Sequence, residues 1–244
     1  MVVLYEHELS RFAMLLAQDF NCEKFSLNVS WFPNGEFKIE PIPLSGKHVL
    51  VIFSCARDIN SQLLKYFLIL QNLQNAKIID VFMPYIPYSR QDKSEAFKFV
   101  LSILRTLKVR KIITIDIHKV IEDKFIVNIL PHELFGKKYL DSDFLVVAPD
   151  IGAISRAKAF AEYLHTKLIT IDKISGHTEN IALVKNRNCL IVDDIIDTGK
   201  TIRNAQDMLM AAGAKHIEYC ISSEARIALH KFHTAIANSI SLFS

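Results

Sequence analysis

The stretch LIVDDIIDTGKT, residues 190–201, decides how this sequence is interpreted. Apolar residues typical of a buried strand lead into carboxylates, and these lead into a polar turn where a helical pattern begins. Ligands of open parallel sheets bind at the carboxyl ends of the strands, so we expect this loop to face a binding crevice. Its polar residues are Asp193, Asp194, Asp197, Thr198, Gly199, Lys200 and Thr201.

The chemistry of this loop suits a phosphorylated sugar. Asp193 and Asp194 offer acceptors for paired hydroxyl donors, as on a ribose ring. Backbone N–H groups at the start of a helix, together with the hydroxyls of Thr198 and Thr201, form a cradle for a monophosphate. One loop can therefore hold a sugar by its diol and by its 5-phosphate.

Two other interpretations of the loop fit the sequence less well. A triphosphate-binding Walker A loop needs a glycine five places before Gly199, but that position is Asp194. A helix start that is acidic only for capping and for the helix dipole explains one aspartate well and three poorly.

The chain around this loop alternates strand and helix patterns. Strands are predicted at 48–53, 77–85, 111–118, 144–150, 167–172, 188–194 and 216–223, and helices at 60–74, 97–107, 154–165 and 201–213. Such alternation predicts an α/β fold with parallel sheets. A faint internal repeat relates residues 49–85 to 189–223, which indicates two similar halves, 1–140 and 141–244.

Composition excludes several classes of protein. The 244 residues carry 29 Lys and Arg against 26 acidic residues, a formal charge of +3, which is too mild for a nucleic-acid surface. No apolar run approaches a membrane span, and the charged N-terminal residues do not suit a signal peptide. The cysteines show no metal-binding spacing, so we expect buried thiols in a reducing compartment. These observations predict a cytoplasmic protein without nucleic-acid or membrane partners.

VDDIIDTGKT resembles the loop that binds 5-phosphoribosyl 1-pyrophosphate (PRPP) in type I phosphoribosyltransferases and in ribose-phosphate pyrophosphokinases. The resemblance implies two tandem phosphoribosyltransferase-like domains, each with a mainly parallel sheet flanked by helices. It also implies that the seven loop residues named above bind ribose 5-phosphate. The loop alone does not separate the two families.

Three other segments resemble the pyrophosphokinases specifically: WFPNGEFKIEP (31–41), MPYIPYSRQDKS (83–94) and IDIHKV (115–120). By resemblance they bind ATP, with Asp116 supporting the histidine that touches the phosphates or their magnesium. Taken alone, the first segment is equally typical of a simple turn at Asn34 and Gly35. The implied ATP-binding residues are Phe32, Asn34, Glu36, Arg90, Gln91, Lys93 and His118.

APDIGAISRAKAFAEYL (148–164) resembles a fourth pyrophosphokinase segment, and the five matching segments occur in the family's order. In it Asp150 is implied to bind Mg²⁺ or the ribose, and His118 is the other implied metal ligand. Gly152 lets the backbone approach a ligand. Lys173 matches the family's catalytic lysine.

The family reaction transfers pyrophosphate from ATP to C1 of ribose 5-phosphate and needs Mg²⁺. The resemblance also implies a homodimer or a larger homo-oligomer. The sequence departs from the family at Ser175, where an arginine is usual, and NSI (238–240) resembles the start of the family's last strand. Two alternatives therefore remain: a non-catalytic or regulatory relative, and a phosphoribosyltransferase that consumes PRPP.

Overall fold

The computed structural model describes residues 1–53, 58–89, 95–117, 123–171, 178–194, 199–227 and 229–241. The chain forms two compact units, Met1–Asn128 with Ala228–Ser244, and Ile129–Ile227. The sequence placed a boundary at residue 140, whereas the chain leaves the first unit after Asn128 and returns to it at Ala228. The division of ATP and ribose-phosphate binding between residues 1–140 and 141–244 stays a prediction.

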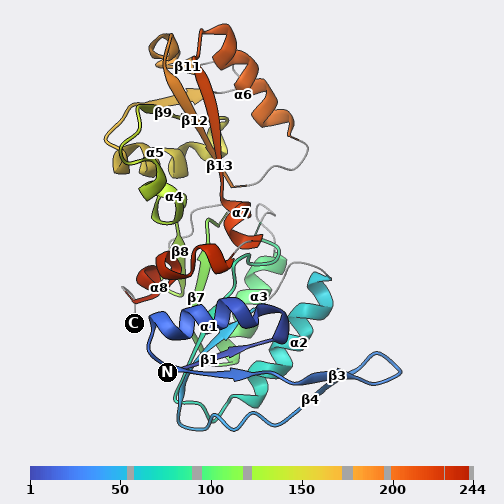
Figure 1. Cartoon of the computed structure of the whole chain (residues 1–244). Coiled ribbons are helices and arrows are strands. Elements are labelled where there is room, and N and C mark those ends of the chain that lie inside the picture. Colours follow the sequence, from blue (N-terminus) through green and yellow to red (C-terminus); the bar gives the residue numbers. More distant parts are fainter. Residues whose placement is uncertain are drawn as a thin grey trace. The chain divides into compact units, whose positions relative to one another are not determined.

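The first unit is built on a six-stranded sheet in the order β2-β1-β5-β6-β7-β8 (Figure 1). Strand β1 pairs in parallel with β2 and β5, and the pairs β5–β6 and β6–β7 are also parallel. The strands are β1 (Val2–Tyr5), β2 (Glu23–Ser26), β5 (His48–Ile52), β6 (Ile78–Phe82), β7 (Val109–Ile115) and β8 (Ile126–Ile129).

Helices flank this sheet because each has an apolar face to bury. Tyr66 and Ile69 of one helix lie fully buried in the same cluster as Val49 and Val51 of the sheet. The Tyr66 ring stacks on Phe53 at a centroid distance of 3.8 Å. The helices of this unit are η1 (His7–Leu9), α1 (Ser10–Asp19), α2 (Ile59–Asn72), α3 (Glu95–Thr106), η4 (Leu229–Lys231) and α8 (His233–Ser241).

A separate antiparallel hairpin joins β3 (Val29–Trp31) to β4 (Phe37–Ile39). It extends sideways from the sheet of the first unit (Figure 1). The rings of Trp31 and Phe37 lie across from each other with centroids 4.2 Å apart. This cross-strand pair stabilises a ribbon that is otherwise largely exposed.

The second unit has a five-stranded sheet in the order β11-β10-β9-β12-β13. All neighbours are parallel except β10 and β11. Its strands are β9 (Phe144–Ala148), β10 (Leu168–Ile171), β11 (Thr178–Glu179), β12 (Asn188–Asp193) and β13 (His216–Ile221). Its helices are α4 (Pro131–Tyr139), η2 (Ile151–Ala153), α5 (Ile154–Tyr163), η3 (Ile181–Val184), α6 (Lys200–Ala211) and α7 (Ser222–Ile227).

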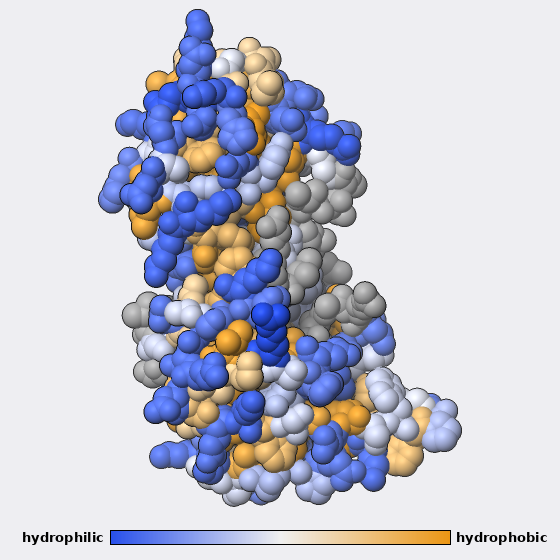
Figure 2. Space-filling view, viewed as in Figure 1, coloured by the Kyte–Doolittle hydropathy of each residue, from blue (hydrophilic) through white to orange (hydrophobic). Residues whose placement is uncertain are grey.

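The structure confirms the predicted fold class of mainly parallel sheets flanked by helices. Each predicted strand and helix coincides with an observed one, and the repeat corresponds to β5-α2-β6 and β12-α6-β13, both with parallel strands. Hydrophilic side chains predominate on the face seen in Figure 2. Among the described residues, no helix is long and apolar enough to span a bilayer.

The expectation of a strand start at residues 238–240 is wrong. Asn238, Ser239 and Ile240 belong to α8, which packs against α1 of the first unit. Ile236 and Ile240 are buried on one side of this helix, and His233 Nδ1 lies 2.6 Å from Asp19 Oδ2. Apolar residues spaced four apart suit a helix face and not a strand.

Candidate functional site

Three carboxylates lie at the carboxyl edge of the second sheet. Asp193 ends β12 and Asp194 follows it, while Asp150 lies two residues after the end of the neighbouring parallel strand β9. Only 7 % of Asp193 and 4 % of Asp194 is exposed. Carboxylates this deeply buried require an opposite charge or hydrogen bonds, because burial in an apolar environment disfavours their charged form.

Arg156 of α5 supplies the opposite charge. Its Nη1 atom lies 3.3 Å from Asp193 Oδ1 and 3.5 Å from Asp194 Oδ1. The same nitrogen donates to the carbonyl of Gly152 at 3.3 Å, and only 4 % of Arg156 is exposed. One buried guanidinium therefore bridges both aspartates and the first turn that leads into α5.

Backbone hydrogen bonds hold the carboxylates in place. The amide of Asp194 donates to Asp193 Oδ1 at 2.8 Å. Asp150 Oδ1 accepts from the amide of Ala153 at 3.1 Å and so caps η2. A Cβ atom at Gly152 would lie 3.3 Å from this same Oδ1, which explains a residue without a side chain at that position.

The pKa of Asp193 is raised to about 7. Burial is the largest cause, and the negative charges of Asp194 and Asp150 add to it. The amide of Asp194 and the charge of Arg156 act in the opposite direction. The edge thus holds a carboxyl that changes charge near neutral pH, which is typical of functional sites.

Of the predicted phosphate cradle at residues 197–201, the structure describes residues 199–201. Gly199 has φ +71° and precedes α6, which begins with Lys200 and Thr201 as the sequence predicted. The carbonyl of Gly199 accepts from the amide of Arg203 at 2.9 Å, so the helix is regular from its start. The left-handed conformation at Gly199 is one that glycine adopts without strain.

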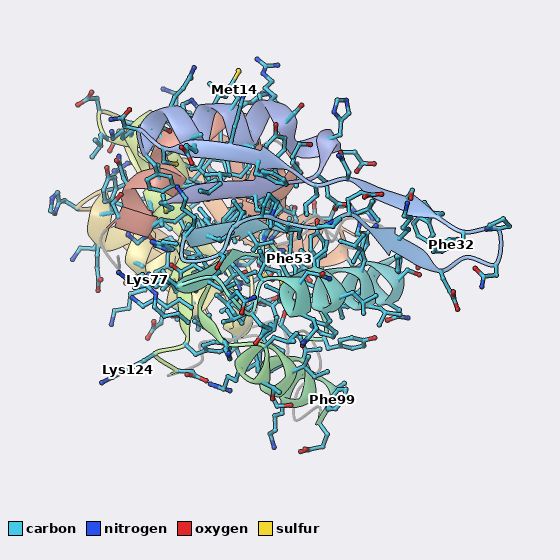
Figure 3. The ribbon with its side chains drawn as sticks, turned by 90° about the horizontal axis from the view of Figure 1, so that it is seen from below. Met14, Phe32, Phe53, Lys77, Phe99 and Lys124 are labelled. Atoms are coloured by element: carbon cyan, nitrogen blue, oxygen red, sulfur yellow. The ribbon has the colours of Figure 1, made fainter. Side chains whose placement is uncertain are left out.

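The hairpin carries the first implied ATP segment. Phe32, Asn34 and Glu36 lie in its turn, where the amide of Glu36 donates to Asn34 Oδ1 at 3.2 Å. Phe32 is 47 % exposed and projects at the hairpin's end, away from the sheet (Figure 3). The turn geometry agrees with the simple-turn interpretation and leaves these side chains accessible to a ligand.

Several predicted residues lie outside the described part of the chain, so the structure does not place them. Asp116 is described: it follows β7, is 1 % exposed and has φ +43°. The residues outside are Arg90, Gln91, Lys93, His118, Lys173, Ser175, Asp197 and Thr198.

The donor chemistry at the edge of the second sheet suits Mg²⁺. This ion prefers oxygen ligands and is usually bound by one or two carboxylates together with substrate phosphates. Asp150 is only partly buried and provides such a carboxylate beside Asp193. No group of three metal-ligating side chains occurs within the described ranges, and the assignment of Asp150 to Mg²⁺ stays a prediction.

The sequence analysis did not assign a role to Arg156. Arg156 and Phe160 lie four residues apart on one face of α5, and both are buried. A charged residue in a buried helical row needs a buried partner. Its partners Asp193 and Asp194 follow a distant strand, which the helix pattern alone does not indicate.

Comparison with known proteins agrees with this geometry. Residues 1–106 match the family described as the N-terminal domain of ribose phosphate pyrophosphokinase, and residues 125–231 match the phosphoribosyl transferase domain. Ribose-phosphate pyrophosphokinase 1 of Streptococcus pneumoniae is 30 % identical over 228 residues, which cover 83 % of this chain and 71 % of that protein. The chain belongs to the ribose-phosphate pyrophosphokinase family.

Other members of the pyrophosphokinase family are similarly close. The ribose-phosphate pyrophosphokinase of Listeria ivanovii is 30 % identical over 230 residues, covering 85 % of this chain and 72 % of that one. The crystal structure of phosphoribosylpyrophosphate synthetase from Mycobacterium smegmatis superimposes with a TM-score of 0.74 at 26 % identity, over 89 % of this chain and 79 % of that chain. The recognised family and its fold are therefore confirmed.

Proposed function

We propose that this protein transfers pyrophosphate from ATP to ribose 5-phosphate, giving PRPP and AMP for nucleotide biosynthesis. The observation that carries the proposal is the pair Asp193 and Asp194, held by Arg156 and influenced by the charge of Asp150, at the start of a PRPP loop in a chain of the pyrophosphokinase family.

Asp193 and Asp194 are the residues that orient the sugar in this proposal. Ionised carboxylates accept hydrogen bonds from two neighbouring hydroxyls, and the positive charge of Arg156 lies beside both side chains. The 5-phosphate is bound by residues 197–201, with Lys200 as a point charge and the α6 amides as donors.

The reaction itself depends on positioning and on neutralised charge. The C1 oxygen of the sugar attacks the β-phosphorus of ATP, the bond from that phosphorus to the α–β bridging oxygen breaks, and the hydroxyl proton is released to solvent or base. Lys173 stabilises negative charge on the transferred group. When bound, Mg²⁺ supplies further positive charge there, and Asp150 and His118 are the residues assigned to it.

ATP is assigned to the first unit. Phe32 offers an aromatic face for the adenine, while Asn34 and Glu36 offer polar contacts to the base or sugar. Arg90, Gln91, Lys93 and His118 are assigned to the polyphosphate and the base edge.

We also propose a homodimer or larger homo-oligomer in the cytoplasm. The observation behind the oligomer is the hairpin, whose tip carries Phe32 on a ribbon that extends away from its own sheet (Figure 3). A second copy of the chain is a partner against which this segment can bind a nucleotide.

A regulatory, non-catalytic relative is the second candidate function. Ser175 favours it, because serine cannot supply the cation that the family's arginine provides. The PRPP loop is complete in this chain, and this favours catalysis.

The deciding experiment is AMP release from purified protein with Mg-ATP, with and without ribose 5-phosphate. AMP that forms only with the sugar supports pyrophosphoryl transfer. If both ligands bind by calorimetry and no AMP forms, the regulatory function is correct, and Ser175→Arg is the variant to test for restored turnover.

A further inference from the structure

Helix α2 carries apolar side chains on both of its faces. On its inner face, Tyr66 and Ile69 are fully buried in the core of the first unit. On its outer face, Leu64 is 55 % exposed and Leu68, one turn later, is 40 % exposed. A helix that is apolar all round is typically buried on every side, so the outer face of α2 is suited to a partner.

The outer face of α2 also lacks charge. From Ile59 to Ala76 the sequence contains one charged residue, Lys65. Its Nζ atom lies 2.5 Å from Glu6 Oε1, and its side chain is only 6 % exposed, so this charge is turned inward. The exposed residues of α2 are Asn60, Leu64, Leu68, Gln71 and Asn72. They form an apolar stripe with side-chain amides at both ends.

The internal repeat supplies a comparison for α2. Helix α6 occupies the same place in the second repeat, and it exposes Lys200, Arg203 and Asp207. Helices α1, α3 and α5 likewise expose charged side chains of both signs. Charged residues are rarely buried and normally cover such helices, whereas the cores of protein interfaces are depleted in charge. The outer face of α2 therefore resembles an interface more than a solvent-facing surface.

The two asparagines at the ends of the stripe offer opposite hydrogen-bonding groups. Asn60 Oδ1 accepts from the hydroxyl of Tyr88 at 2.5 Å, which leaves the Nδ2 donors of Asn60 to another acceptor. Asn72 Nδ2 donates to the carbonyl of Leu68 at 2.9 Å, which leaves Asn72 Oδ1 as an acceptor. A donor at the start of the helix and an acceptor at its end match a second α2 that runs in the opposite direction.

We propose that the outer face of α2 is covered by the same face of a second copy of this chain, with the two helices antiparallel about a two-fold axis. In such a contact each pair of residues occurs twice. Leu64 lies opposite the partner's Leu68, and Asn60 Nδ2 donates to the partner's Asn72 Oδ1. Both pairs are symmetric about residue 66, so one axis serves both.

The absence of charge favours a second copy as the partner. Near a two-fold axis a charged side chain meets a side chain of its own sign, which costs binding energy, and an uncharged stripe avoids this. The inference rests on the homo-oligomer proposed above and names the surface that forms it.

One helical stripe covers less than the roughly 800 Å² per partner that a stable interface buries. Further apolar side chains lie on the same side of the first sheet, which α2 and α3 both cover. Phe67 of α2 is partly buried, and Phe99 of α3 is 64 % exposed and projects away from the sheet (Figure 3). These rings extend the contact beyond the two leucines.

The test uses two double variants of the full chain. The acidic variant carries Leu64→Glu and Leu68→Glu, and the basic variant carries Leu64→Lys and Leu68→Lys. Sedimentation equilibrium measures self-association of each variant alone and of their equimolar mixture. We expect the dissociation constant of each variant alone to rise at least about hundredfold, because like charges oppose each other across the axis. The mixture should associate within about tenfold of the unmodified chain, because opposite charges then meet.

Met210→Glu is the matched control. Met210 is 56 % exposed on α6, the counterpart of α2 in the second repeat, so the control adds the same charge to an equally exposed helix position. Self-association should be unchanged in this control. Far-UV circular dichroism, the thermal unfolding midpoint and calorimetry with ribose 5-phosphate, which is assigned to the second unit, should agree among all variants and show that each is folded.

The proposal is overturned if the acidic and basic variants associate as the unmodified chain does. It is also overturned if the mixture stays as dissociated as each variant alone, because α2 then meets a different surface of its partner. An unmodified chain that remains monomeric overturns the proposed homo-oligomer together with this inference. Association through α2 without AMP release in the enzymatic assay supports this inference and overturns pyrophosphoryl transfer alone.

Discussion

Replacing Arg156 by methionine removes the cation between two buried aspartates and keeps much of the side-chain volume. Breaking a buried ion pair by removing one partner costs about 3–5 kcal/mol of unfolding free energy. The pKa of Asp193 is already about 7, so at pH 7 a bound proton relieves part of this cost. We therefore expect a loss of about 2–4 kcal/mol at pH 7.

The loss of unfolding free energy in Arg156→Met should grow as the pH rises. The charge of Arg156 lowers the pKa of Asp193, so in Arg156→Met this pKa rises further above 7. Above pH 7 the folded variant keeps a proton that the folded parent has released, while the unfolded chains are alike. The difference in unfolding free energy between the parent and Arg156→Met should thus increase by up to about 1.4 kcal/mol from pH 7 to pH 8. It should decrease toward pH 6.

Urea unfolding at pH 6, 7 and 8, followed by far-UV circular dichroism, measures this gap. Circular dichroism is preferable to fluorescence because the single tryptophan, Trp31, lies on the hairpin of the first unit. Arg187→Met is the control: its ion pair with Asp143 is exposed and should contribute less than about 1 kcal/mol, with no trend over this pH range. A gap for Arg156→Met that is as small as the control's, or that narrows as pH rises, would refute the reasoning.

Three predictions concern ligands. Asp194→Asn should weaken ribose 5-phosphate binding by about tenfold or more, as for a hydrogen bond to a charged group, and leave ATP binding intact by calorimetry; equal loss of both would contradict the division of ligands. The affinity for ribose 5-phosphate should rise as the pH passes through about 7, because Asp193 accepts hydrogen bonds from hydroxyl donors only fully when it is ionised. If the affinity of Asp193→Asn shows the same rise with pH, the assignment of Asp193 is wrong. Lys173→Ala should lower turnover by about 10²–10³ with unchanged dissociation constants, and unchanged turnover would remove Lys173 from the mechanism.

The sequence predicted the elements that bury continuous apolar runs. Strand β12 is such a run, and its parallel neighbour β9 brings Asp150 to the edge where Asp193 lies. The strand pattern placed Asp193 and Asp194 at the carboxyl end of a strand, whereas the position of Asp150 at the same edge was not predicted. The roles of these residues stay predictions.

Contacts between distant segments were beyond the sequence patterns. Nothing local in Arg156 indicates which charges it meets, since its partners follow a strand some 37 residues later. The NSI stretch was expected to start a strand by resemblance to the family, yet it belongs to α8, which buries Ile236 and Ile240 and packs against α1. Tertiary packing overrides local preference in such short segments.

The return of residues 228–244 to the first unit makes the second unit an insertion within the first. Helix α1 ends at Asp19, roughly 210 residues before α8 begins, and α8 packs against it. At translation rates of about 5–20 residues per second, the side of α1 that contacts α8 waits on the order of 10–40 seconds for this partner. The inserted unit can fold within that interval, whereas the first unit also needs the residues that follow the insertion.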